Sequence, residues 1–512
     1  MADNSSANKR IAKNSIFMSI RMIIVLFITL YTTRVILQTL GVIDYGVYNV
    51  VCGFVSMFAF LNTSMSNGIQ RFFNFELGKN GIVGAKKVYN TALIIQFILA
   101  VIIIILTESF GMWYLHNKMV IPEDRLFAAE WIFQFSIMGF LFVIMQAPFT
   151  AAVIAHERMD FFAAISVLDA FLKLGIVFAL PSVPGDNLIV YGFLFASINI
   201  LNFALYAIYS RKNFEEIRLQ GSIQKSLFKS MLSFSGWNLF GSFSGVMKEQ
   251  GINLVLNLFF GPVVNAARAV AAQVNSGLQS FVSNITMPVR PQVVQSYAKG
   301  DLQRTMGLTI SISKLSCGFQ YLLALPLSYE IDFVLKIWLG DEVPEHSGLF
   351  IVIIFVTSFL NNLNSAVSNV IHATGKMKLY QITTSLVALL AVPFAYISLQ
   401  MGASPEIALS MVSVTMFFAQ VLAVFILEKI VGFSAKSYFS KIVKPLLYVI
   451  ATTIWVPLIT TSISVCWCRF MFTILLSTIV VLLSFYYVGL DKQERVLVIQ
   501  MIEVTRKKIV KK

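Results

Sequence analysis

The chain has 512 residues, of which 57% are hydrophobic and 12% are charged, and its mean hydropathy is +0.78. Soluble proteins carry about 25% charged residues, so this composition excludes a soluble globular protein and indicates a polytopic membrane protein. The formal net charge of +14 would favour nucleic-acid binding in a soluble chain, but in a membrane protein its distribution between the loops decides its meaning.

The first apolar run covers residues 15–40 and contains two arginines, Arg21 and Arg34. As a helix, this run is long enough to cross a bilayer. A charge inside a lipid-spanning helix costs roughly 3 kcal/mol on insertion scales, so each arginine requires water, a partner or a bound anion. A second run with the same character, residues 231–258, carries Lys248 and Glu249. The pattern favours a transporter of a negatively charged substrate. The first run ends in TTRVILQ rather than at small residues, so we expect no cleaved signal peptide.

Apolar runs of about 20 residues predict fourteen membrane spans. Their centres lie near residues 27, 55, 100, 137, 170, 198, 245, 276, 316, 360, 390, 417, 454 and 479. Of the 39 basic residues, 29 fall in the connections and tails on one side, and four fall on the other: Lys118, Arg125, Lys336 and Arg469. The positive-inside rule then places both termini in the cytoplasm, which requires an even number of spans.

The sequence repeats weakly, with a nearly constant offset between its two halves. Gly41 corresponds to Gly261, and Pro184 corresponds to Pro405. The tripeptide at 121–123, Ile-Pro-Glu, corresponds to Val-Pro-Glu at 343–345. Six spans is an even number, so the two halves share one orientation. This predicts a parallel repeat related by an axis along the membrane normal, with a binding site between the halves near the midplane.

The expected organisation follows from this repeat. Residues 1–209 form an N-lobe of six spans, residues 210–229 form a cytoplasmic linker, and residues 230–430 form a C-lobe of six spans. Residues 431–512 add two further spans and a basic cytoplasmic tail. Anchoring to anionic lipid is the simplest explanation for the tail, and a surface that recruits a cytoplasmic partner is the alternative.

Ionisable residues inside the spans are the candidate binding residues. The basic candidates for substrate binding are Arg21, Arg34, Lys173, Lys248, Arg268 and Lys314. Asp169 and Lys173 lie four residues apart on one helical face, so a pair that only neutralises itself remains an alternative. Arg34 and Arg268 can instead extend towards the outer interface. Lys248 and Lys314 lie near span centres without such an exit and are the strongest candidates.

Uncharged polar residues and two carboxylates accompany these bases. The residues expected to support a polar cavity are Asp169, Glu249, Asn253, Asn361 and Asn364. Several asparagines share one face of the span near residue 245, and others crowd the span near residue 360. A water-filled cavity explains this crowding, and hydrogen bonding between helices is the alternative.

The sequence contains no convincing catalytic motif. The four histidines stand singly, and the cysteines show no metal or redox spacing. The segment Ala373-Thr374-Gly375-Lys376 lacks the earlier glycine of a phosphate-binding loop. We expect a protein that is not an enzyme, needs no cofactor or metal, and works by binding and conformational change.

The predicted spans, the repeat, the basic linker and the segment LGVIDYGVY at residues 40–48 resemble the polysaccharide exporters of the MOP superfamily. The resemblance is to Wzx-type flippases and bacterial lipopolysaccharide or capsule biosynthesis proteins. It implies an all-α, MATE-like fold and alternating access in the bacterial cytoplasmic (inner) membrane. The implied substrate is an anionic oligosaccharide linked to undecaprenyl pyrophosphate, held in a cationic cavity. The implied partners are the phospholipid bilayer and glycan polymerase or other assembly proteins, with no nucleic acid.

Three alternatives stay open. MATE-type drug exporters share the fold, but many carry an acidic cation site in the first span, where this chain has Arg21 and Arg34 and no carboxylate before Asp44. A lipid II flippase is the second alternative. A scaffold that organises glycan assembly enzymes without transport is the third, and it predicts that neutralising the charges inside the spans affects only stability.

Overall fold

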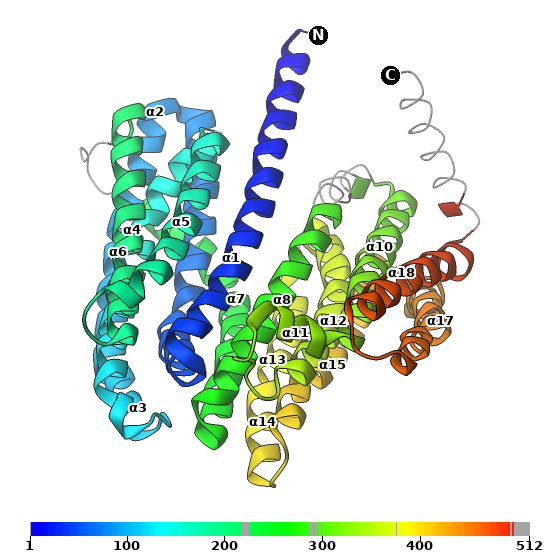
Figure 1. Ribbon diagram of the computed structural model, residues 1–512. Coiled ribbons are helices and arrows are strands. Elements are labelled where there is room, and N and C mark those ends of the chain that lie inside the picture. The colour runs from blue at the N-terminus through cyan, green and yellow to red at the C-terminus, as the bar shows by residue number, and fades with distance from the viewer. Residues whose placement is uncertain are drawn as a thin grey trace. The chain divides into compact units, whose positions relative to one another are not determined.

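The computed structural model describes residues 2–156, 158–217, 225–286, 293, 296–297, 300–374, 376–491 and 494–495, with side chains of the first helix from residue 21 onward. Every regular element in these ranges is helical (Figure 1). The predicted all-α polytopic membrane fold is therefore confirmed. The chain divides into two compact units, and each is described separately.

Unit 1 comprises residues 1–273, 338–347 and 388–412. It begins with two very long helices, α1 (Ala2–Ser56) and α2 (Ala59–Leu106), each interrupted at a glycine. Gly41 interrupts α1 with φ 76°, and Gly81 interrupts α2 with φ 60°. These are left-handed conformations that glycine adopts without steric cost, so the chain can reverse direction there. The two helices therefore supply three consecutive helical segments.

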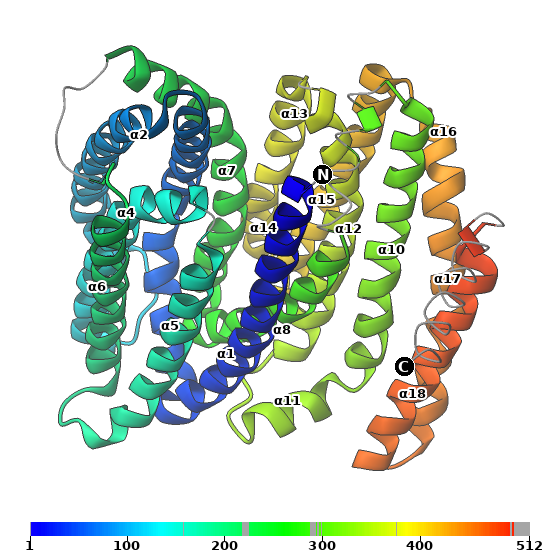
Figure 2. The same ribbon diagram turned by 90° about the horizontal axis from the view of Figure 1, so that it is seen from above.

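The remaining helices of unit 1 follow α1 and α2 in the chain. They are α3 (Met112–Asn117), α4 (Leu126–Ala155), α5 (Met159–Ala179), α6 (Asn187–Asn213), α7 (Lys225–Phe260), the first part of α8 (Pro262–Thr286), α14 (Ala391–Gln400) and the start of α15 (Pro405–Val431). Helix α4 packs against α2 and α6, α5 packs against α1, and α7 packs against α2 and α14 (Figure 1 and Figure 2).

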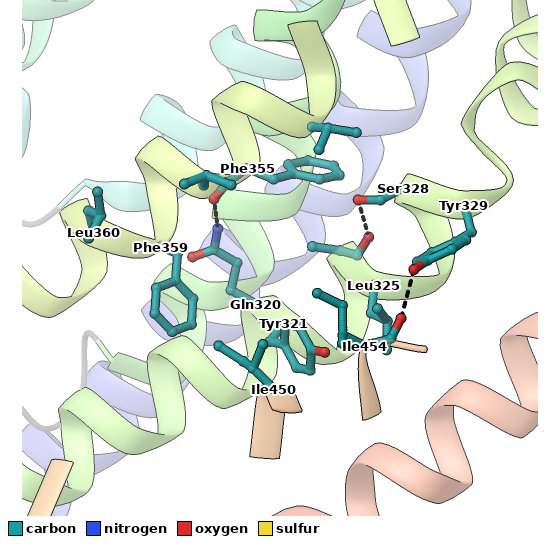
Figure 3. A pocket seen from close by; sticks show the side chains of 13 residues that line it. Gln320, Tyr321, Leu325, Ser328, Tyr329, Phe355, Phe359, Leu360, Ile450 and Ile454 are labelled. Carbon is teal, nitrogen blue, oxygen red and sulfur yellow. Dashed lines mark hydrogen bonds between the residues drawn. The ribbon is translucent and has the colours of Figure 1, made fainter. Parts of the chain in front are cut away.

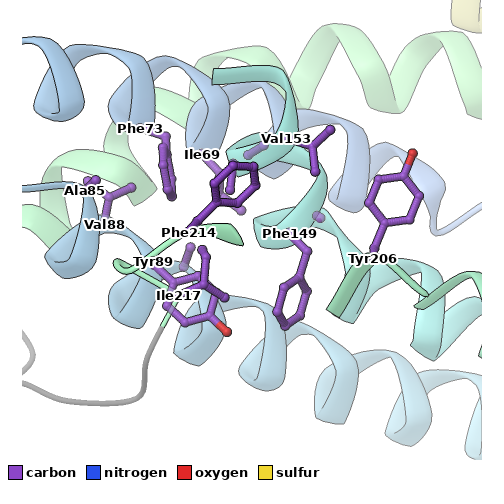
Figure 4. Close-up of a cluster of buried hydrophobic side chains, with 14 of the residues drawn as sticks. Ile69, Phe73, Ala85, Val88, Tyr89, Phe149, Val153, Tyr206, Phe214 and Ile217 are labelled. Carbon is purple, nitrogen blue, oxygen red and sulfur yellow. The ribbon is translucent and has the colours of Figure 1, made fainter. Parts of the chain in front are cut away.

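A core of buried apolar side chains holds α2, α4 and α6 together. Ile69 and Phe73 from α2 meet Phe149 and Val153 from α4, and Tyr206 joins them from α6 (Figure 4). Large residues buried on three helices fix the spacing of these helices, because a close-packed interior tolerates few voids.

Unit 2 comprises residues 274–337, 348–387 and 413–512. Besides the remainders of α8 and α15, its helices are α10 (Leu302–Tyr329), α11 (Ile331–Leu339, up to residue 337), α12 (Ser347–Thr374, from residue 348), α13 (Met377–Leu389, up to residue 387), α16 (Ala435–Tyr438), α17 (Lys444–Thr453) and α18 (Trp467–Ser484). Its core joins Cys317 of α10, Val370 of α12, Leu427 of α15 and Tyr438 of α16. Helices α17 and α18 pack on each other and on α10.

Eleven helices in the described part of the chain are long and apolar enough to cross a membrane. The other three predicted spans, centred near residues 55, 245 and 276, also fall on helices: the region between Gly41 and Gly81, α7 and α8. Of these three regions, α7 and α8 are not among the eleven, whereas residues 42–56 belong to the candidate span Arg21–Ser56. The sequence pattern placed every predicted span on a helix but overstated how many are strongly apolar.

The weak repeat has a counterpart in the backbone. Gly41 and Gly261 both have positive φ, 76° and 72°, and each ends one helix and begins the next. Gly81 and Gly300 form a second such pair, with φ of 60° and 76°, and Gly185 and Gly402 form a third, with φ of 123° and 84°. Left-handed turns therefore recur at the offset that the sequence repeat predicts.

The lobe boundaries at residues 209, 230 and 430 stay a prediction. Unit 1 combines α7 and α14 with the first six predicted spans, and it ends inside α15. Part of the predicted linker, residues 218–224, and most of the basic tail, residues 496–512, lie outside the described residues.

Candidate functional site

Two buried bases share one carboxylate in unit 1. Lys248 and Glu249 lie on α7, and Arg268 lies on α8 beyond the Gly261 turn. Arg268 Nη2 donates to Glu249 Oε2 at 2.9 Å and to the Glu249 carbonyl oxygen at 2.7 Å, while Lys248 Nζ lies 3.6 Å from Glu249 Oε1. Lys248 and Arg268 are 7% and 9% exposed. Taken by themselves, these three side chains carry one more positive than negative charge.

Arg268 also keeps an unused donor. Its Nε is buried and has no hydrogen-bond partner in the described part of the chain. An unsatisfied buried donor is costly, and here it belongs to a charged group. This donor is therefore a candidate contact for an anion.

Arg21 on α1 lacks a carboxylate partner among the described residues. Its Nη1 lies 3.5 Å from Ser166 Oγ, which is a weak contact, and its guanidinium lies 5.3 Å from the centre of the Phe162 ring. Its Nε is buried without a hydrogen-bond partner among the described residues, and no carboxylate there forms an ion pair with Arg21. Arg34 lies half-buried farther along the same helix.

Lys173 is neutralised within its own helix, as the sequence spacing allowed. Its Nζ lies 2.8 Å from Asp169 Oδ2 on α5 and 4.9 Å from the centre of the Phe195 ring. Asn202 of α6 donates to Asp169 Oδ1 at 2.7 Å. The group links α5 to α6 and adds no net charge.

Lys314 in unit 2 has a partner far away in the sequence. Its Nζ lies 2.8 Å from Glu494 Oε2, and its side chain is 3% exposed. Glu494 and Asp491 accept hydrogen bonds from each other's backbone N–H groups, both at 2.9 Å, which fixes the carboxylate at the end of the last described segment. No local pattern in the sequence indicates this pair, because 180 residues separate its members.

The asparagines of α7 form a hydrogen-bonded network instead of lining an open space. Asn265 donates to the Asn253 carbonyl oxygen and to Asn253 Oδ1 at 2.7 and 2.8 Å. Asn257 donates to Asn265 Oδ1 and exchanges hydrogen bonds with the backbone of Val120. Asn253 also contacts the Asn49 carbonyl oxygen at 3.4 Å. This network ties α7 to α8, to α1 and to the loop before α4.

The asparagines of α12 are divided between contacts and free positions. Tyr380 donates to Asn364 Oδ1, and Asn362 donates to Gln320 Oε1 at 2.5 Å. Asn361 is half-buried and makes no side-chain hydrogen bond to the described residues. Of the two predicted cavity residues on this helix, Asn361 is thus the one without a side-chain hydrogen bond to the described residues.

Three contacts between titratable side chains that the sequence reasoning missed join helix ends in unit 1. Arg125, before α4, bonds Asp44 in α1 at 2.5 and 2.7 Å and Asp186, the N-cap of α6, at 2.6 and 3.1 Å. Burial alone raises the pKa of Asp186, but hydrogen bonds from Arg125 and from backbone N–H groups bring that pKa below its usual value. His346 bonds Glu406 at 2.5 Å. The offset of the repeat relates Arg125 to His346 and Asp186 to Glu406, so the repeat could have revealed both.

Unit 2 contains an open apolar pocket of about 490 Å³ between α10, α12 and α17. Its walls are mainly side chains such as Leu325, Phe355, Phe359 and Ile450 (Figure 3). Its few polar groups are engaged: Gln320 donates to the Phe355 carbonyl oxygen at 2.8 Å, and Tyr329 donates to the Ile454 carbonyl oxygen at 2.8 Å. Such a pocket suits a hydrocarbon chain better than a polar group.

No three His, Cys, Asp or Glu side chains come together as metal ligands within the described ranges. The arrangement offers binding groups: buried bases in unit 1 and an apolar pocket in unit 2.

Neither family models nor curated proteins match this chain. Several solved structures do match it. The chain has the MOP-superfamily fold. It matches the lipid II flippase MurJ in an inward closed conformation with a TM-score of 0.70, at 13% identity, over 92% of this chain and 98% of MurJ. It matches a multidrug resistance MATE transporter in an inward-facing conformation with a TM-score of 0.67, at 13% identity, over 81% of this chain and 100% of that one.

A third match is a MOP-superfamily transporter from Pyrococcus furiosus, whose reversed binding-pocket polarity is described as suggesting a different function. Its TM-score is 0.61 at 13% identity, over 82% of this chain and 96% of that one. At these identities the comparisons establish the fold of a multi-pass integral membrane protein, which agrees with the resemblance seen in the sequence.

Proposed function

We propose that this protein is a flippase for an anionic, lipid-linked oligosaccharide. It moves an undecaprenyl-pyrophosphate-linked glycan across the bacterial cytoplasmic membrane by alternating access, for synthesis of a surface polysaccharide such as O-antigen or capsule. Both termini lie in the cytoplasm. Glycan polymerase and other assembly proteins are its expected partners.

The observation that carries the proposal is the excess of positive charge inside the spans. Lys248 and Arg268 both contact Glu249, and Arg21 pairs with no carboxylate among the described residues. At roughly 3 kcal/mol for each charge in a span, these residues are costly unless they bind something negative. A pyrophosphate provides that charge and strong acceptors for the free guanidinium N–H groups of Arg21 and Arg268.

The membrane potential favours the same direction of transport. An inside-negative potential drives an anion outward by about 2.3 kcal/mol per charge per 100 mV. The cationic groups thus lower the barrier for a charged head group, while the potential assists its release outside.

The apolar pocket of unit 2 supports a substrate with a lipid tail. Its volume of about 490 Å³ and its apolar walls suit a segment of a polyprenyl chain. Lipid II is the second candidate substrate, because the MurJ match spans 92% of this chain and lipid II is the substrate that MurJ's name gives. A drug antiporter is less well supported, since a cationic drug would be repelled by Arg21 and by the Lys248–Arg268 group.

The test is glycan export in a cell whose own gene for this protein has been deleted and replaced by variants expressed at equal levels. Without the protein, the lipid-linked glycan accumulates on the inner side. We expect Lys248→Gln to lower export at least tenfold, because the remaining Arg268–Glu249 pair is neutral. Lys248→Arg keeps the charge and retains most export. Lys118→Gln, on the exposed loop after α3, is the matched control and leaves export unchanged.

Normal export with Lys248→Gln would show that the charge is structural and would favour a scaffold. Loss of drug resistance without glycan accumulation in the deleted cell would instead favour a drug antiporter.

A further inference from the structure

A second, uncharged pocket lies in unit 1 between α2 and α4. Its volume is about 220 Å³. The polar side chains that line it are Asn62, Ser66 and Gln70 on α2, and Gln146 and Thr150 on α4. On both helices the polar residues are four apart, so each set forms a stripe along one face of its helix. The rest of its lining is aliphatic, and it contains no charged residue.

The hydrogen bonds of this pocket run within helices and not between them. Ser66 donates to Asn62 Oδ1 at 3.3 Å, and Gln146 Nε2 lies 3.4 Å from Thr150 Oγ1. Gln70 makes no side-chain hydrogen bond to any described residue. Polar residues that join membrane helices would bond across the interface. The amides of Asn62, Gln70 and Gln146 instead keep donors and acceptors for a ligand.

The neighbouring core keeps this pocket from collapsing. Ile69 of α2 directly precedes Gln70, and Phe149 of α4 directly precedes Thr150 (Figure 4). These buried side chains set the separation of α2 and α4, so the polar stripes beside them cannot close on each other to satisfy their own hydrogen bonds. The open donors and acceptors are therefore a fixed property of the helix pair.

The chemistry of the lining selects a class of ligand. Asn and Gln amides and Ser and Thr hydroxyls each both donate and accept, as a sugar hydroxyl does. The absence of charge gives no preference to phosphate or to a cation. The volume is below the roughly 300–1,000 Å³ of pockets for drug-sized ligands, which suits a single ring. We propose that this pocket binds one neutral sugar ring of the transported glycan, an inference that rests on the proposed function and identifies the part of the substrate that α2 and α4 recognise.

The test uses the full-length protein in phosphatidylcholine nanodiscs. One arm measures saturation-transfer NMR with methyl glycosides of glucose, galactose, mannose and N-acetylglucosamine, which carry no charge and no lipid. We expect at least one glycoside to bind, and Gln70→Leu and Gln146→Leu each to reduce its signal at least fivefold. Thr63→Val, an exposed polar position on the same helix, is the control and keeps the signal. Thermal unfolding of each variant confirms that it is folded.

The second arm compares the binding of farnesyl diphosphate with that of farnesyl-diphospho-N-acetylglucosamine. We expect the sugar to strengthen binding at least tenfold in the wild-type protein and less than threefold in Gln70→Leu. Failure of farnesyl diphosphate to bind the wild-type protein would contradict the proposed function, while the glycoside arm would still decide the sugar site.

The proposal is wrong if no glycoside binds the wild-type protein, or if Gln70→Leu and Gln146→Leu bind as well as it does. It is also wrong if adding phosphatidylglycerol to the nanodiscs abolishes glycoside binding, because the hydroxyls of a lipid headgroup would then be the natural ligand.

Discussion

At the scale of single residues, the charges inside the spans fall into two groups. Lys173 and Asp169 pair within one helix, and their spacing of four residues was enough to foresee it. The partners of Lys314 and Arg268 come from distant segments, so no local pattern could indicate them. The sequence identified the charged residues inside the spans, because they interrupt apolar runs. It could not tell which of them pair with a carboxylate.

The Lys314–Glu494 pair leads to a prediction about stability. Glu494→Gln leaves Lys314 buried without its counter-charge, and breaking a buried pair in this way costs about 3–5 kcal/mol. Combining it with Lys314→Met removes both charges and recovers most of the loss. Equilibrium unfolding of the purified protein in mixtures of detergent and SDS measures both variants. Equal stability of Glu494→Gln and the wild-type protein would contradict the importance of this contact.

At the scale of helices, the turns were more predictable than the packing. Gly41 and Gly261 were matched by sequence offset, and both adopt the left-handed conformation that lets a helix end. The close contact between the two regions could not be foreseen: Gly46, in the pass that follows Gly41, lies directly against the backbone of Pro262 at the start of α8. Sequence spacing determines where a helix turns, whereas tertiary packing decides what the turn touches.

This contact predicts that Gly46→Ala is strongly destabilising. The added methyl group would overlap the Pro262 carbonyl group, which is backbone and cannot rotate away. Overpacking of this kind typically costs about 1–3 kcal/mol and occasionally more. Gly175→Ala is the matched control, because a methyl group there meets no atom within 4 Å. Thermal unfolding in detergent distinguishes the two, and equal midpoints would show that α8 moves aside freely.

At the scale of the whole molecule, composition predicted the membrane class and the helical fold because both depend on averages over many residues. The fourteen predicted spans all fall on helices, although α7 and α8 are too polar to be counted by hydropathy within the described residues. The polar pocket between α2 and α4 was not predicted, because its lining comes from two helices whose packing the sequence does not show.

The charge asymmetry predicts the topology. In a background with all four cysteines replaced, cysteines at Lys118 and Glu345 should react with an impermeant maleimide added outside intact cells. Cysteines at Arg304 and Lys436 should react only after the cells are opened. All four positions are exposed, so accessibility reports the side of the membrane. Labelling of Arg304→Cys from outside would overturn the positive-inside assignment.

The recurring left-handed glycines have a consequence for the origin of the chain. Three pairs of turns, matched at a nearly constant offset, are the expected trace of a tandem gene duplication. In the predicted six-span repeat, each copy crosses the membrane an even number of times, so both of its ends lie on the same side. Two such copies can be joined end to end without changing which of their loops carry the basic residues. Divergence of two such copies accounts for turns that persist in both halves while the charged residues inside the spans differ.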